Sequence, residues 1–181
     1  MGWFSPVKGS YPSLAQVDKA LPVLPGNTAI ERGTIVALAG GDEVNSTEGA
    51  WKIAEATDKV LYVALQDYSD PTAGFAGSTF DPNGGTPKIN GIDLHQDGEY
   101  ETSVFDSNIQ DYAVGDELYV GEGGILTKTK AEGAQLVGIV TLAPTTRWIN
   151  NAIALPADQK DPRLAIRTGA NKPVIRFKTA G

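Results

Sequence analysis

The sequence of 181 residues contains no cysteine and a single histidine, His95. Without cysteine there is no disulfide, no zinc–thiolate site and no thiol nucleophile. One histidine leaves little room for a histidine-based catalytic triad or for a metal site with several imidazole ligands. These absences favour a protein that is not an enzyme and that uses no metal or other cofactor.

Long apolar runs are also missing. No segment approaches the roughly 18 apolar residues that are needed to cross a membrane. The first eight residues, Met-Gly-Trp-Phe-Ser-Pro-Val-Lys, lack the apolar core of a secretion signal. The sequence therefore predicts a protein that neither enters a membrane nor is exported by such a signal.

The best candidate for metal binding or catalysis is the cluster of Asp93, His95, Asp97 and Glu99. Its spacing differs from that of a calcium-binding loop, and it offers a single imidazole. A solvated turn explains the cluster better than a metal site does. An enzyme centred on His95, Asp97 and Glu99 remains the third hypothesis for the function, with no catalytic residue assigned.

Glycine and proline are abundant, with 21 and 11 residues, and they separate short runs rich in β-branched and aromatic residues. This pattern is typical of an antiparallel β-protein with frequent turns. Its clearest example is the segment 111–142, in which three β-prone runs are separated by glycine clusters. We expect a mainly β fold, a small antiparallel β-barrel or β-sandwich, with extended terminal arms and one long inserted loop.

A weak internal repeat supports two similar halves. The run that begins at Gly33 (Gly-Thr-Ile-Val-Ala-Leu) resembles the run that begins at Gly115 (Gly-Asp-Glu-Leu-Tyr-Val). The run from Leu61 (Leu-Tyr-Val-Ala-Leu) likewise resembles the run from Leu136 (Leu-Val-Gly-Ile-Val). Generic β-meander composition is the alternative explanation.

The composition suggests three parts: an N-terminal arm at 1–29, a body at 30–156, and a basic C-terminal arm at 157–181. Within the body, residues 67–93 are rich in glycine, proline and aspartate and predict a protruding loop. In the first arm, Ser13–Leu21 has the apolar spacing of a short helix that lies on a surface. In the last arm, Pro173–Thr179 predicts an amphipathic strand that adds to a sheet edge of its own subunit or of a neighbour.

Charge is distributed unevenly along the chain. Residues 30–143 contain 6 basic and 19 acidic residues, whereas residues 144–181 contain 7 basic and 2 acidic residues. An acidic body with a basic tail indicates that the tail meets an acidic surface, on a neighbouring copy or on another protein. Nucleic acid is a weaker interpretation, because the basic residues are scattered and the body would repel phosphates.

The repeated glycine-led runs, the Gly-Gly-Ile-Leu-Thr hairpin at 123–127 and the closing Leu-Val-Gly-Ile-Val at 136–140 resemble the capsid decoration, or cement, proteins of tailed bacteriophages. The resemblance covers roughly residues 30–143. It implies a non-enzymatic virion protein, made in the host cytoplasm, on the outer capsid surface. It also implies that the protein clamps neighbouring major capsid subunits, commonly as a homotrimer, with arms that cross subunit boundaries.

Aromatic and arginine side chains in the arms and the loop are the candidate contacts with the capsid or with neighbouring copies, because such residues dominate interface energetics. The alternative function is a β-barrel binding module that displays its loop to a glycan or a host surface. The candidate contact residues are Trp3, Phe4, Tyr11, Phe75, Phe80, Arg163, Arg167, Arg176 and Phe177.

Overall fold

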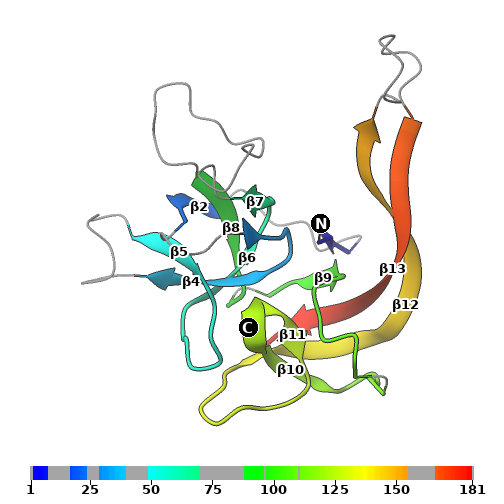
Figure 1. The fold of residues 1–181 in the computed structure, drawn as a ribbon. Helices are drawn as coiled ribbons and strands as arrows, with labels where there is room; N and C mark the ends of the chain where they lie inside the picture. Colours follow the sequence, from blue (N-terminus) through cyan, green and yellow to red (C-terminus); the bar gives the residue numbers. More distant parts are fainter. Residues whose placement is uncertain are drawn as a thin grey trace.

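The structure is a computed structural model that describes residues 2–7, 17–23, 29–39, 49–69, 88–95, 97–109, 111–154 and 166–180. Tyr11, Phe75, Phe80 and Arg163 lie outside these ranges. The described part of the chain is mainly β and its strand ladders are antiparallel, which confirms the predicted fold class (Figure 1). The strands form two main sheets that do not close into a barrel, with one small additional pair.

The first sheet has six strands, and the second has five. In spatial order, the first contains β1 (Phe4–Pro6), β9 (Glu99–Thr102), β13 (Ile166–Thr179), β12 (Leu136–Ala154), β10 (Glu117–Val120) and β11 (Leu126–Thr127). The second contains β2 (Val17–Pro22), β8 (Lys88–Asp93), β6 (Leu61–Ala64), β4 (Ile35–Ala39) and β5 (Ala50–Ile53). The small pair consists of β3 (Ala29–Ile30) and β7 (Tyr68–Ser69), and a 3-10 turn, η3 (Glu122–Gly124), follows β10.

Apart from the additional strand β1, the two sheets share one topology, which confirms the predicted internal repeat. In chain order, β2, β4, β5, β6 and β8 occupy the same places in the second sheet as β9, β10, β11, β12 and β13 in the first. The two halves also repeat backbone hydrogen bonds. The amides of Gly33 and Gly115, both at φ 97°, donate to the carbonyls of Ala64 and Val140 at 2.8 and 2.9 Å. The glycines are required because their positive φ admits other residues only at a cost.

The second sheet is buried on both faces. Along β6, Leu61 and Val63 belong to an apolar cluster shared with the first sheet, whereas Tyr62 and Ala64 belong to a separate cluster around Trp51. A strand covered on both sides should be apolar throughout, which is why this run is continuous rather than alternating. The shared cluster joins the two halves into one body.

Both predicted arms need correction. The expected helix at Ser13–Leu21 is wrong over its described part, because residues 17–22 form β2 and pair with β8. A helix of nine residues is marginal alone, so the β ladder prevails over local propensity. The N-terminal segment also supplies β1, which pairs with β9 and brings Phe4 into the shared cluster.

The described part of the basic C-terminal segment, residues 166–180, is not a free arm. Strand β13 pairs with β12 over most of its length, and its last residues insert between β12 and β9 within the first sheet. Of the two predicted options, pairing within the same subunit is the observed one, at a central position rather than at an edge. The inserted loop is also shorter than predicted at both ends, because β7 and β8 contain residues 68–69 and 88–93.

The centre of the shared cluster contains a polar group without a partner. Tyr100 is fully buried between Phe4 and Phe177, at ring-centroid distances of 5.0 and 6.1 Å. Its hydroxyl is buried and has no hydrogen-bond partner in the described residues. Burial, and secondarily the charges of Asp93 and Asp97, raise the pKa of this phenol.

Replacing Tyr100 with phenylalanine should leave the free energy of unfolding unchanged or increase it by about 1 kcal/mol, because a buried unpaired hydroxyl is costly. Tyr112→Phe is the matched control, since the Tyr112 hydroxyl donates to the Asp106 carbonyl at 3.2 Å. The control should lose about 1 kcal/mol. Urea unfolding at pH 7 measures both, and a clear loss in Tyr100→Phe would contradict the expectation.

Candidate functional site: the projecting ribbon

Within the described residues, a two-stranded ribbon projects from the first sheet; it is made of residues 143–154 of β12 and 166–174 of β13. Its two strands pair from Thr145 opposite Val174 to Ala154 opposite Ile166. Figure 1 shows the ribbon curving away from the first sheet and extending well past the other strands. The same two strands run without interruption into the sheet, so the ribbon is a continuation of the core.

Most described residues of the ribbon are exposed, and one of them is a large aromatic residue. Trp148 is 54% exposed, whereas the next residue, Ile149, is 5% exposed. Trp148 lies opposite Asn171 and Arg147 lies opposite Lys172, so Trp148 and Arg147 project from opposite faces. An exposed tryptophan on a projecting element is a strong candidate contact residue, because tryptophan is enriched at interface hot spots.

The base of the ribbon is joined to β9 by two arginines that share one carboxylate. Arg176 Nη2 lies 2.6 Å from Glu101 Oε1, and Arg147 Nη2 lies 2.7 Å from the same oxygen. The Glu101 side chain is only 8% exposed, whereas those of Arg176 and Arg147 are 28% and 44% exposed. We call these three residues the arginine–glutamate latch.

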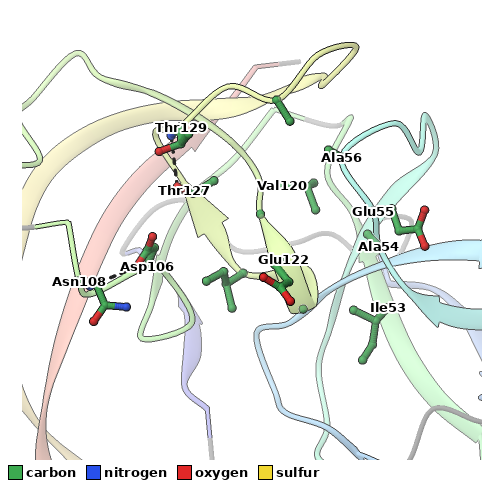
Figure 2. A pocket seen from close by; sticks show the side chains of 14 residues that line it. Ile53, Ala54, Glu55, Ala56, Asp106, Asn108, Val120, Glu122, Thr127 and Thr129 are labelled. Atoms are coloured by element: carbon green, nitrogen blue, oxygen red, sulfur yellow. Dashed lines mark hydrogen bonds between the residues drawn. The ribbon is translucent and has the colours of Figure 1, made fainter.

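A groove opens on the body between β5 and the β10–β11 hairpin, with a volume of about 860 Å³. Figure 2 shows residues 53–56 on one side and the segment with Thr127 and Thr129 on the other. Among the described residues, its lining includes the carboxylates of Glu55, Asp106 and Glu122 but no lysine, arginine or histidine. Such a lining favours cationic over anionic groups.

The described residues contain no group of three or more metal-ligating side chains, nor a helix long and apolar enough to cross a bilayer. In the predicted cluster around His95, the imidazole Nδ1 lies 3.0 Å from Asp93 Oδ1 at an exposed turn. This contact is local, between residues two positions apart, and it matches the solvated-turn interpretation.

The structure separates the candidate contact residues into different environments. Phe4 and Phe177 are 1% and 0% exposed inside the shared apolar cluster, so neither presents a surface to a partner. The sequence predicts both on terminal arms, whereas strand pairing places β1 and the end of β13 in the sheet and buries these two rings. Trp3 is partly buried, and its backbone is held against Ser103 by two hydrogen bonds of 2.9 Å.

Of the arginines, Arg176 belongs to the latch, and Arg167 lies on the ribbon opposite Ile153, in a stretch whose side chains are not described. Trp148 and Glu101 are not among the contact residues expected from the sequence. A signal for Trp148 was present, since it stands in the run Pro-Thr-Thr-Arg-Trp-Ile-Asn-Asn with mainly polar neighbours. No local sequence pattern marks Glu101 as a contact residue, because its role depends on two arginines that are 46 and 75 residues away in the chain.

Comparison with known proteins identifies no relative of this chain. No protein-family model matches the chain, and no curated protein or solved structure is significantly similar to it.

Proposed function

We propose that this chain is a non-enzymatic structural protein of a tailed-phage virion, which binds the outside of the capsid and stabilises it by clamping neighbouring major capsid subunits. The observation that carries the proposal is the ribbon, a two-stranded extension of central core strands on which Trp148 is exposed. The sequence resemblance to decoration proteins supports the same role.

A clamp must transmit load from its contacts to its body. Here the ribbon strands continue into the first sheet, where β12 and β13 are hydrogen-bonded on both sides by β10 and β9. Force on the ribbon therefore acts on a ladder of backbone hydrogen bonds rather than on a flexible linker. In a capsid, many copies repeat each weak contact, so modest affinity per copy gives substantial stabilisation.

Charge supports contacts between copies as well as with the capsid. The chain from residue 144 onward has 7 basic and 2 acidic residues, and the preceding body is strongly acidic. A ribbon of one copy near the body of the next would meet opposite charge, which favours association as an oligomer such as a homotrimer. The major capsid protein remains the principal partner in this proposal.

Purified protein added to undecorated heads of the cognate phage should bind them and raise the temperature at which they rupture. Trp148→Ala should weaken this binding about tenfold or more, as expected for an interface tryptophan. Sedimentation of heads with bound protein measures affinity, and a DNA-release assay measures rupture. The unfolding temperature of the isolated variant should stay close to that of the parent, because the side chain is exposed.

Val114→Ala is the matched control, since Val114 is 66% exposed on the body and its truncation should leave head binding unchanged. Absence of binding by the parent protein, together with unchanged head resistance, would reject the proposed function. Equal loss of binding in both variants would reject the ribbon as the contact element. Glycan binding by a protein without the ribbon would instead favour a binding module.

A further inference from the structure

We infer that Glu101 is a positioning residue that fixes the direction of the ribbon relative to the body, through the arginine–glutamate latch. The geometric part of this inference stands on the described contacts alone. Its consequence for capsid binding rests on the proposed function.

The latch lies on the outer face of the first sheet, as the strand pairing shows. Glu101 on β9 is directly opposite Arg176 on β13, and the next pair along the same two strands is Tyr100 opposite Phe177. Tyr100 and Phe177 point into the shared apolar cluster, so Glu101 and Arg176 project from the outer face of the first sheet. The hydrogen bonds from Arg176 Nε and Nη2 to Glu101 Oε1, at 3.0 and 2.6 Å, are therefore a local cross-strand contact.

The contact from Arg147 is different, because Arg147 belongs to the ribbon. It lies opposite Lys172, four residues before Arg176 on β13. In a flat sheet the backbones of Arg147 and Glu101 would lie about 13 Å apart along the strands and also two strands apart across the sheet. The side chains of arginine and glutamate together do not span this combined separation. The observed distance of 2.7 Å between Arg147 Nη2 and Glu101 Oε1 therefore indicates that the ribbon curls toward the outer face.

The strand pairing shows where the curl arises. The register between β12 and β13 shifts between Val140 and Leu142 and again between Leu142 and Thr145. Irregularities of this kind bend strands and increase their twist. They lie between the sheet and the ribbon, so they form a bend at the ribbon base, which Figure 1 shows as the curve of β12 and β13.

The latch spans this bend. Arg176 comes from the part of β13 that is paired with β9 in the sheet, and Arg147 comes from the ribbon beyond the bend. One largely buried carboxylate accepts from both, and charge-assisted hydrogen bonds of this type are stronger than neutral ones. A bend that is closed by a shared carboxylate is held in one arrangement, so the ribbon is preorganised before it meets a partner.

The absence of cysteine in the chain makes a direct distance test possible. Spin labels on Lys59→Cys in the body and Asn171→Cys in the ribbon would report the ribbon direction by pulsed electron resonance, since both positions are exposed. The parent should give one narrow distance distribution. Arg147→Gln, which removes only the ribbon side of the latch, should broaden or shift it, and Glu101→Gln should do the same.

Two further variants separate positioning from general stability. Arg147→Lys keeps the positive charge, so its distance distribution should remain nearly as narrow as that of the parent. Lys178→Gln removes one positive charge from the same strand as Arg176, in an exposed pair with Asp97, and should leave the distribution unchanged. A distribution that stays narrow and unshifted in both Arg147→Gln and Glu101→Gln would overturn the inference.

Head binding tests the consequence separately. If the ribbon acts as a clamp, Arg147→Gln should bind heads about tenfold more weakly, the effect expected for one charge-assisted hydrogen bond lost from a preorganised contact. Failure of the parent protein to bind heads would reject the proposed function. The distances between the spin labels would still test whether the latch fixes the direction of the ribbon. Unchanged binding by a variant with a freed ribbon would overturn the role of preorganisation.

Discussion

Replacing Phe177 with alanine is expected to lower the free energy of unfolding by about 3–5 kcal/mol. The Phe177 ring is fully buried and packs against Tyr100, which in turn stacks on Phe4 from the N-terminal strand. The residue lies where β13 inserts between β12 and β9, so the cavity would form at the junction of three strands. A loss of this size is a large fraction of the stability of an ordinary domain.

Urea unfolding followed by tryptophan fluorescence and circular dichroism measures this loss, with equal m-values confirming that the comparison is valid. Trp148→Ala is the control, because it truncates an aromatic residue that is 54% exposed and should change stability by about 0.5 kcal/mol or less. Retained stability combined with lost capsid binding would instead mean that Phe177 is an interface residue.

Replacing Gly124 with alanine should lower the free energy of unfolding by about 3 kcal/mol. Gly124 has φ 70° at the end of η3, and a Cβ atom there would meet the Ile35 carbonyl oxygen and, at 2.9 Å, Thr34 Cγ2. The Ile35 carbonyl accepts the Ala54 amide at 3.1 Å, so it cannot move freely. The turn of the second repeat thus packs directly on the backbone of the first.

Gly123→Ala is a closely matched control for Gly124→Ala. Gly123 has φ 72°, but a Cβ atom there would meet nothing within 4 Å. The free energy of unfolding of Gly123→Ala should therefore fall only by the cost of placing alanine at a positive φ, about 1 kcal/mol. Thermal and urea unfolding of both variants isolate the contact between the repeats, and equal losses would show that this contact contributes nothing.

Local sequence patterns were sufficient for the strands of the body. Glycine-led β runs predicted β4 and β10, and the continuous apolar run predicted that β6 is a central strand. The two halves share their strand order and backbone hydrogen bonds but few side chains. The amino-acid sequence therefore shows the repeat only weakly. Turn glycines such as Gly33 and Gly115 were its best signal, since their positive φ is set by the backbone itself.

The termini were predicted less well, because strand partners far apart in sequence decide their structure. Val17, Leu21 and Pro22 pair with β8, about 70 residues away, and this ladder outweighs the local helical spacing. The same reason places Phe4 and Phe177 in the core rather than on arms. An amphipathic strand shows two faces in its sequence but does not show what covers the apolar one.

The sequence by itself determined the fold class of this protein, an antiparallel β fold, and its charge distribution, with an acidic body and a basic C-terminal region. Those properties depend on composition and on patterns within a few residues. Only the tertiary structure decided that the basic region returns as a hairpin, that Trp148 is exposed on it, and that Glu101 joins its base to the body. The physical reason is that register, burial and ion pairing arise between distant segments, which meet only when the chain has folded.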